Sequence, residues 1–263
     1  MSGDGERARY TFGDSATASE RLARVARVFA PSTEALLARL NDRAPRRVLD
    51  LGCGPGHTTR LLARMFPGAT VCGLEQSEAF LAEARRTATS ETSFEHADVS
   101  LMPLPGAPAD LVYARFVLSH LRERGPLLHG WFDALTAGGV LAIEEVDRIE
   151  TIDQTFRAYL AITSGLMADR GGELYVGHEL STTAQGLGGT VLVDTSVPVT
   201  PTTADIATIF ALNLQSWRND SWVAAHYDRR TLDDLAIALH AHQSTAGSGL
   251  IRWTLRQVVV ARE

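Results

Sequence analysis

The chain has 263 residues, 45% of them hydrophobic and 21% charged, so it is long enough to bury the core of one large globular domain. All 25 of its basic residues are Arg, and the absence of Lys excludes a Schiff base to pyridoxal phosphate and a P-loop of the GxxxxGK[ST] kind. The net charge of -6 weighs against a nucleic-acid partner, because a phosphate backbone is usually met by a concentrated basic surface.

Export, membrane insertion and metal binding are not expected from the sequence. The N-terminus, MSGDGERARY, carries charges where a signal peptide needs an apolar core, and no apolar run reaches the length of a membrane span. Cys53 and Cys72 are the two cysteines, and neither a CxxC nor an HExxH spacing occurs. We therefore expect a cytoplasmic protein with no membrane partner and no metal.

The first elements in chain order predict a helical cover followed by a parallel sheet. Apolar periodicity indicates a helical segment over 19–40, broken at Pro31, which packs on the sheet edge; a lid is the alternative. After it, short β-branched or apolar runs alternate with helical patterns, as is typical of a parallel α/β sheet. The expected strands are 47–51, 70–75, 93–98, 109–115 and 140–146, and the expected helices are 57–66, 77–86 and 121–135.

The second half of the chain is predicted to add a cap. A helix over 153–170 ends at the glycine pair 171–172, and β-like runs follow at 190–200 and 250–261. The insertion over 201–249 is too long for a hairpin loop and shows helical spacing, so we expect a helical cap there. The predicted organisation is an N-terminal helical cover over 1–45 and a main domain over 46–263 that contains this cap.

The stretch VLDLGCGPGHTT, residues 48–59, places three glycines directly behind the first strand. Gly52, Gly54 and Gly56 follow a G-x-G-x-G spacing, whereas the dinucleotide fingerprint G-x-G-x-x-G has its third glycine where His57 stands. This offset weakens the case for a pyrophosphate ligand. A nucleoside with an amino-acid head group, or a tight turn with no ligand, remains open.

Two carboxylates stand at the ends of the first two strands. Asp50 lies where ligands of open α/β sheets bind, so it can hold a ligand ammonium group; hydrogen bonding within its own loop is the alternative. Glu75 ends the second strand about 20 residues beyond the glycines, which is the offset at which an acid binds ribose hydroxyls.

Five segments in order, VLDLGCGPG, GLEQS, EHADVSLMPLP, DLVYARFVLSHL and LTAGGVLAIEE, resemble the successive motifs of class I S-adenosylmethionine-dependent methyltransferases. The resemblance covers residues 46–147 and implies S-adenosylmethionine as the cofactor. It also implies an α/β fold with a doubly wound, mostly parallel seven-stranded sheet, a helical cap and an antiparallel last strand. The cofactor-binding residues that it implies are Gly52, Cys53 and Gly54 for the methionine moiety, Glu75 for the ribose, Gln76, Asp98 and Val99 for the adenine, and Arg115, Phe116 and His120 in the loop beneath the sulfonium.

The leading segment YTFGDSATASERL is similar to the start of small-molecule members of this family, in which a tyrosine and an arginine help to hold the methionine carboxylate. Tyr10 and Arg21 are the candidates here, because Arg is suited to bidentate carboxylate binding. A surface position for Arg21 is the alternative.

Methyl transfer is an in-line displacement that depends on proximity and orientation, and it needs a base only if the acceptor must lose a proton. The candidate bases near the ligand edge are His120, Glu145, Tyr175 and His178. Glu144 and Glu145 are neighbours on a strand and so point to opposite faces, and we favour Glu145. A salt bridge of this carboxylate to Arg115 or Arg148 is the alternative.

The acceptor is expected to be a small molecule. Arg115 and the EEVD segment replace the metal ligands of metal-dependent relatives, which favours a metal-independent reaction. Aromatic residues in the cap and its flanks suit a flat, largely apolar acceptor, such as an aromatic secondary metabolite methylated on carbon at an indole-like ring. O- or N-methylation of a natural product, a non-catalytic S-adenosylmethionine-binding module and a nicotinamide-dependent oxidoreductase remain open, as does a monomer or a homodimer.

Overall fold

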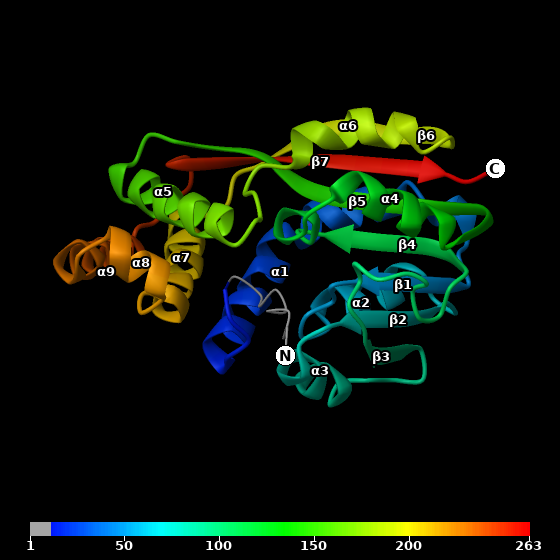
Figure 1. Cartoon of the computed structure of the whole chain (residues 1–263), viewed down its shortest axis with the longest axis horizontal. Helices are drawn as coiled ribbons and strands as arrows, with labels where there is room; N and C mark the ends of the chain where they lie inside the picture. The colour runs from blue at the N-terminus through cyan, green and yellow to red at the C-terminus, as the bar shows by residue number, and fades with distance from the viewer. Residues whose placement is uncertain (1–11) are drawn as a thin grey trace, which may run out of the picture.

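A seven-stranded sheet runs through the computed structural model, which describes residues 12–263 (Figure 1). Its strands are β1 (Arg47–Leu51), β2 (Thr70–Glu75), β3 (Thr92–His96), β4 (Ala109–Arg115), β5 (Leu135–Thr151), β6 (Thr190–Val199) and β7 (Ile251–Ala261). Their order across the sheet is β3-β2-β1-β4-β5-β7-β6, with β1 to β5 parallel and β7 antiparallel to both of its neighbours. The expected mostly parallel sheet with an antiparallel last strand is confirmed.

Helices cover both faces of the sheet, because side chains along the central strands point alternately to the two faces. The helices on the sheet are α1 (Ala16–Ala38), α2 (His57–Met65), α3 (Glu78–Arg85), α4 (Arg124–Asp133) and α6 (Gly177–Gly186). On one face, α1 and α2 pack over Val48 and Tyr113. On the other face, α4 and α6 pack over Leu49 and Val112. The sheet is therefore doubly wound, as the sequence predicts.

Helix α1 corrects the expected break at Pro31, because it runs through this residue without interruption. It begins at Ser15, whose side chain accepts a hydrogen bond from the Ala18 N–H. Proline removes one helical hydrogen bond, but Phe29 and Thr33 on either side of it are buried, and Pro31 itself faces outward. Packing on the sheet outweighs the local cost of the proline.

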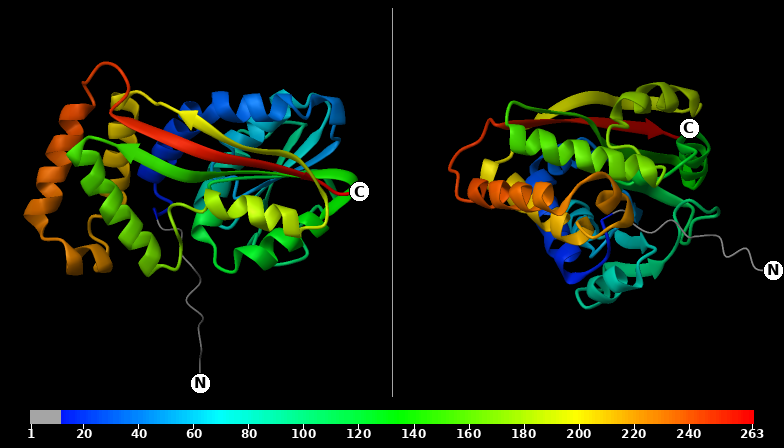
Figure 2. Two further views of the ribbon diagram at one scale, coloured as in Figure 1. Left: turned by 90° about the horizontal axis from the view of Figure 1, so that it is seen from above. Right: turned by 60° about the vertical axis from the view of Figure 1, so that its left-hand side comes forward.

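Strand β5 is much longer than the expected 140–146, and it carries the chain out to the cap. Its second half pairs with β7 as far as Thr151. The register of this pairing shifts by one residue between Val146 and Arg148. Figure 2 shows β5 and β7 running beyond the other strands toward the helices at one end of the molecule. Helix α6 also differs from the sequence analysis, which predicts no helix over 177–186.

The cap is built from α5 (Gln154–Asp169), α7 (Thr203–Trp217), α8 (Ser221–His226) and α9 (Arg229–His242). Three of these helices lie within 201–249, so the helical character expected of this insertion is confirmed. Their apolar faces share one core, to which Phe156, Phe210 and Leu239 contribute. Helix α1 packs against α7, so the cover and the cap meet.

Within residues 12–263, none of the helices has both the length and the apolar character needed to cross a membrane.

Candidate functional site

The carboxyl ends of the parallel strands bring the sequence motifs together at one edge of the sheet. β1, β2 and β4 are neighbours and end at Leu51, Glu75 and Arg115. Parallel strands present their carboxyl ends at the same edge, where open α/β sheets bind ligands. The glycine turn, the Glu75 carboxylate and the loop after β4 therefore meet, although they lie far apart in the sequence.

The three glycines after β1 are required by their backbone conformation. Gly52, Gly54 and Gly56 have φ values of 63°, 54° and 79°, in the left-handed region that residues with a side chain rarely adopt. A Cβ atom on Gly52 would also lie 2.8 Å from Val117 Cγ2, and one on Gly56 would lie 2.7 Å from Phe94. At Gly54 the nearest described atom would be Leu22 Cδ1, at 3.4 Å. Of the three, Gly54 leaves the most room beside the turn.

Asp50 and Cys53 are buried beside this turn. Thr59 Oγ1 donates a hydrogen bond to Asp50 Oδ2 over 2.7 Å, which ties the end of β1 to the first turn of α2. Burial raises the pKa of Asp50 to about 7, against the opposing effect of the Thr59 hydrogen bond. The Cys53 side chain packs with Leu81 and Phe94 in the core. A ligand at this point would meet the backbone of Cys53.

Glu75 organises the turns at the ends of β1 and β2. Its Oε2 accepts a hydrogen bond from the Gly54 N–H at 2.9 Å, and its Oε1 accepts from the N–H groups of Gln76 and Ser77, each at 2.8 Å. Burial raises the pKa of Glu75, while these backbone donors act in the opposite direction. The structure thus brings the Glu75 carboxylate to the glycine turn.

Asp98 and Val99 follow β3 at the same edge. Asp98 Oδ1 accepts a hydrogen bond from the Ser100 N–H at 2.9 Å, which fixes a turn. The Val99 carbonyl accepts one from Trp131 Nε1 at 2.8 Å, so the turn is anchored on α4.

The loop after β4 is held by Glu145, which the sequence analysis favours as a base. Glu145 Oε1 accepts hydrogen bonds from the N–H groups of Val117 and Leu118, both at 2.7 Å. Its Oε2 is buried and has no hydrogen-bond partner among the described residues. Burial raises the pKa of Glu145 to about 8, and the two N–H groups oppose that rise. The alternative of a salt bridge to Arg115 or Arg148 is wrong, because the carboxylate contacts backbone.

His120 lies on this loop, beside Arg21 from α1 and Phe12 from the N-terminal segment. The His120 ring meets Phe12 edge-on at 5.5 Å between ring centroids, and the Arg21 guanidinium lies 5.0 Å from the centre of the Phe12 ring. Burial lowers the pKa of His120 to about 3, and the Arg21 charge adds to that effect. Arg21 is buried, so a surface position is wrong for it. Tyr10 lies outside the described residues.

Phe12 was not among the expected site residues, and no motif in the sequence marks it. Its position depends on contacts with His120 and Arg21, which come from other parts of the chain. Val117 was missed for the same reason, because its close approach to Gly52 is visible only in three dimensions.

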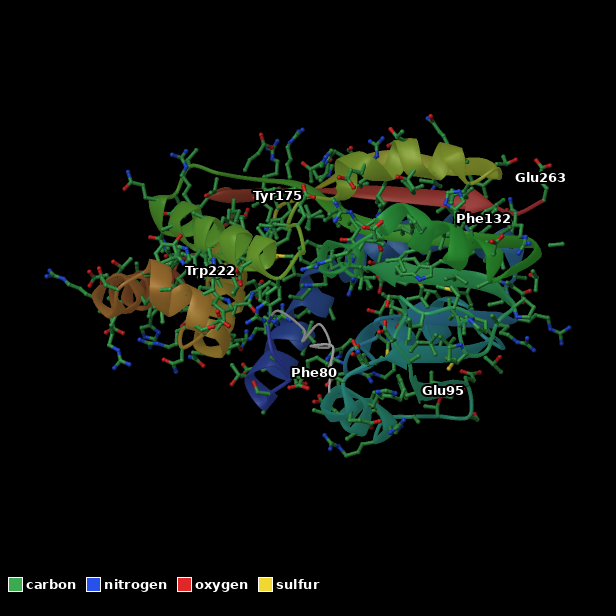
Figure 3. The ribbon with its side chains drawn as sticks, in the orientation of Figure 1. Phe80, Glu95, Phe132, Tyr175, Trp222 and Glu263 are labelled. Carbon is green, nitrogen blue, oxygen red and sulfur yellow. The ribbon has the colours of Figure 1, made fainter. Side chains whose placement is uncertain are left out.

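Arg115 stands beside the start of α2, directly after the glycine turn, and Tyr175 and His178 lie farther along the chain. Arg115 donates hydrogen bonds to Thr33 Oγ1 at 2.9 Å and Thr58 Oγ1 at 3.3 Å, linking β4 to α1 and α2. Tyr175 is half-buried, burial raises its pKa, and it lies between the sheet and the cap (Figure 3). His178 is exposed on α6. The structure does not bring His178 to the Glu145 carboxylate.

His178 belongs to a surface group with Glu173 and Glu179, whose ligand atoms all lie within 4.8 Å of one another. Arg124 forms salt bridges with both carboxylates, at 2.8 Å to Glu173 and 3.1 Å to Glu179. The Arg124 guanidinium therefore already contacts both carboxylates of this group.

Comparison with known proteins finds sequence similarity over less than half of the chain. Residues 48–139 match the model of a methyltransferase domain family. The trans-aconitate 2-methyltransferase of Methylobacterium nodulans is 47% identical over 116 residues, which are 44% of this chain and 44% of that protein. The enzyme of the same name from Delftia acidovorans is 45% identical over 119 residues, again 44% of each chain. The chain thus matches less than half of the length of these relatives.

A solved structure extends the similarity to the fold. Phosphoethanolamine N-methyltransferase 2 from Haemonchus contortus, in complex with phosphomonomethylethanolamine and S-adenosylhomocysteine, gives a TM-score of 0.51 at 19% identity. The superposition covers 82% of this chain and 48% of that chain. At this identity the likeness shows the fold alone.

Proposed function

Because residues 48–139 are a methyltransferase domain in a chain with the class I methyltransferase fold, we propose that the protein transfers a methyl group from S-adenosylmethionine to a small molecule. One observation carries the proposal: the glycine turn, the Glu75 carboxylate and the loop after β4 meet at the carboxyl edge of the sheet. This argument rests on the site, since a fold by itself does not determine function.

The residues at this edge fit the proposed cofactor. Gly54 offers backbone without a side chain, and the Glu75 oxygens keep lone pairs that can accept hydrogen bonds from ribose hydroxyls. Arg21 is a buried cation beside the loop after β4, which suits a carboxylate. Bound here, S-adenosylmethionine supplies an electrophilic methyl group on a sulfonium. Gly54, Glu75, Asp98 and Arg21 would hold it.

The protein's own contribution to the reaction is orientation more than proton transfer. A base with a pKa near 3, as at His120, is weak at neutral pH, and Glu145 already binds two backbone N–H groups. His120 stays neutral above about pH 4 and can position an acceptor by hydrogen bonding. We infer a metal-independent, in-line transfer to an atom that is nucleophilic without strong base assistance.

The acceptor is proposed to be a small, largely apolar molecule, held between the loop after β4 and the cap. The relatives are named for trans-aconitate, a small carboxylate substrate, but the matched methyltransferase domain ends at residue 139, before the first cap helix. Aromatic side chains such as Tyr159 and Phe210, which stack on each other, belong to the cap core and favour an aromatic acceptor. Methylation on carbon does not require a heteroatom to lose a proton first, so it suits a site in which His120 is a weak base. Methylation on oxygen or nitrogen is the second candidate.

Transfer of labelled methyl tests this function. We expect wild-type protein to label at least one acceptor in a panel of phenols, indoles and small carboxylates, and Glu75→Gln to lose about 10-fold or more in kcat/KM through weaker cofactor binding. Glu78→Gln is the matched control, because Glu78 is exposed on α3 and pairs only with Arg85 among the described residues. A wild-type protein that binds S-adenosylhomocysteine but labels nothing would instead be a non-catalytic binding module.

A further inference from the structure

The core of the cap contains a polar cluster between α5 and α7. The Tyr159 ring stacks on Phe210 at 3.7 Å between centroids, and it lies 5.9 Å from the Trp217 ring. Asn213 Nδ2 donates a hydrogen bond to the Tyr159 hydroxyl at 2.6 Å. Thr163 follows Tyr159 by one helical turn, and Trp217 follows Asn213 by one turn, so both pairs face the same interface.

Three polar atoms of this cluster have no hydrogen-bond partner among the described residues. They are Thr163 Oγ1, Asn213 Oδ1 and Trp217 Nε1, and their residues are 3%, 5% and 2% exposed. Burying a polar group without a partner is costly, and native proteins avoid it unless the group has another use. One hydroxyl, one acceptor and one donor thus lie buried without partners in the cap core.

This cluster is continuous with the proposed methyl-transfer site. The segment that follows α5 docks on the loop after β4, where the Glu173 N–H donates to the Ser119 carbonyl at 2.8 Å. Phe12, which meets His120, belongs to the same apolar core as Tyr159 and Trp217. Figure 3 shows Trp222 on the cap and Tyr175 between the cap and the sheet. A molecule that reaches the cluster would therefore extend from the site.

Among the described residues of the cap helices, no arginine side chain is buried beside the cluster. Arg170 pairs with Asp220, Arg218 pairs with Asp233, and Arg157 donates to the Thr151 carbonyl. These guanidinium groups are at least partly exposed. A carboxylate in the cluster would therefore find no buried counter-charge on the cap helices, and it would also face the Asn213 carbonyl oxygen.

We propose that Thr163, Asn213 and Trp217 bind the polar end of the acceptor, and that this end is neutral, with one hydrogen-bond donor and one acceptor, as in an amide, a lactam or a phenol. Asn213 Oδ1 accepts from the donor of the ligand, Trp217 Nε1 donates to its acceptor, and the Thr163 hydroxyl does either. This inference rests on the proposed methyltransferase function and specifies the substrate class of the same site. The proposed acceptor is neutral, and in this it differs from trans-aconitate, the carboxylate in the names of the relatives.

Stability of the free protein provides the first test. Thr163→Val removes a hydroxyl that has no partner, so we expect Tm to rise by about 2–4 °C. Thr92→Val is the matched control, because the buried Thr92 Oγ1 accepts a hydrogen bond from the Thr89 N–H at 2.9 Å, and its Tm should fall. If Thr163→Val lowers Tm as Thr92→Val does, the hydroxyl stabilises the fold and the proposal is wrong.

Ligand binding provides the second test, with protein saturated by S-adenosylhomocysteine. We expect benzamide to bind about 10-fold more tightly than benzoate, which has the same shape but carries a charge. Thr163→Val and Trp217→Phe should weaken amide binding, Thr163→Ser should restore it, and S-adenosylhomocysteine affinity should not change. Tighter binding of the benzoate or of trans-aconitate, or no binding of the amide, would overturn the proposal. Failure of the wild type to bind S-adenosylhomocysteine would instead overturn the proposed function and leave the Tm comparison valid.

Discussion

At the residue scale, the carboxylates of the site are satisfied by backbone N–H groups more than by cations. Glu75 accepts three such hydrogen bonds and Glu145 accepts two. Asp110, at the opposite edge, accepts from the N–H groups of Arg46 and Arg47, each at 2.9 Å. A sequence shows which acids have arginines nearby, but it does not show which turns expose N–H groups. The alternative of a salt bridge to Glu145 is wrong for this reason.

The raised pKa of Glu145 predicts a pH dependence of stability. Its carboxyl group titrates at about 8 in the folded protein, against 4.5 as its ordinary value, so the folded state holds the proton more tightly. The free energy of unfolding therefore falls as pH rises from about 4.5 to 8, by up to about 1.4 kcal/mol per pH unit. Glu145→Gln removes this group and should lose that part of the slope.

Urea unfolding of wild type and Glu145→Gln at pH 5, 6, 7 and 8 measures the effect. The stability of the wild type relative to the variant should decrease across this range, while Asp50 and His120 contribute to both proteins alike. A difference that stays constant with pH would show that Glu145 is charged in the folded protein throughout.

At the scale of the elements, local pattern predicted the central strands but not the parts that form through packing. The apolar runs of β1, β2 and β4 are buried between helices, so composition marks them. The second half of β5, DRIET, is polar, because it pairs with β7 beyond the core. It therefore lacks the apolar run by which a buried strand can be predicted from the sequence. Helix α6 was missed because GHELSTTAQG is rich in glycine and threonine. It forms because Leu180 and Ala184 enter the core.

Two glycines of α6 give opposite predictions for the same substitution. A Cβ on Gly177 would lie 2.7 Å from the Asp147 Cα and 2.8 Å from its N, so Gly177→Ala should lift α6 from β5 and destabilise the protein by about 1–3 kcal/mol. Gly186→Ala meets no described atom within 4 Å and should be neutral or stabilise by about 0.5–1 kcal/mol. Thermal unfolding of both variants compares them. Equal changes in Tm would show that α6 does not rest closely on β5.

At the scale of the whole molecule, the sequence predicted the half of the chain that holds the proposed cofactor site better than the cap. Gly52, Gly54 and Glu75 lie within short motifs whose spacing follows from the strand-turn-helix geometry. The polar cluster of the cap depends on Thr163 and Asn213, which lie on different helices and share no local pattern. Such a cluster is defined by contacts across the core, and one sequence does not reveal them.

Isothermal titration with S-adenosylhomocysteine tests the central claim most directly. We predict one binding site per chain in wild type, weaker binding by Glu75→Gln, and unchanged binding by Glu78→Gln. Ligand at 100 times its Kd should also add about 2.7 kcal/mol to the free energy of unfolding, and so raise Tm. No heat of binding and no shift in Tm at millimolar S-adenosylhomocysteine would contradict a cofactor site at the carboxyl edge of the sheet.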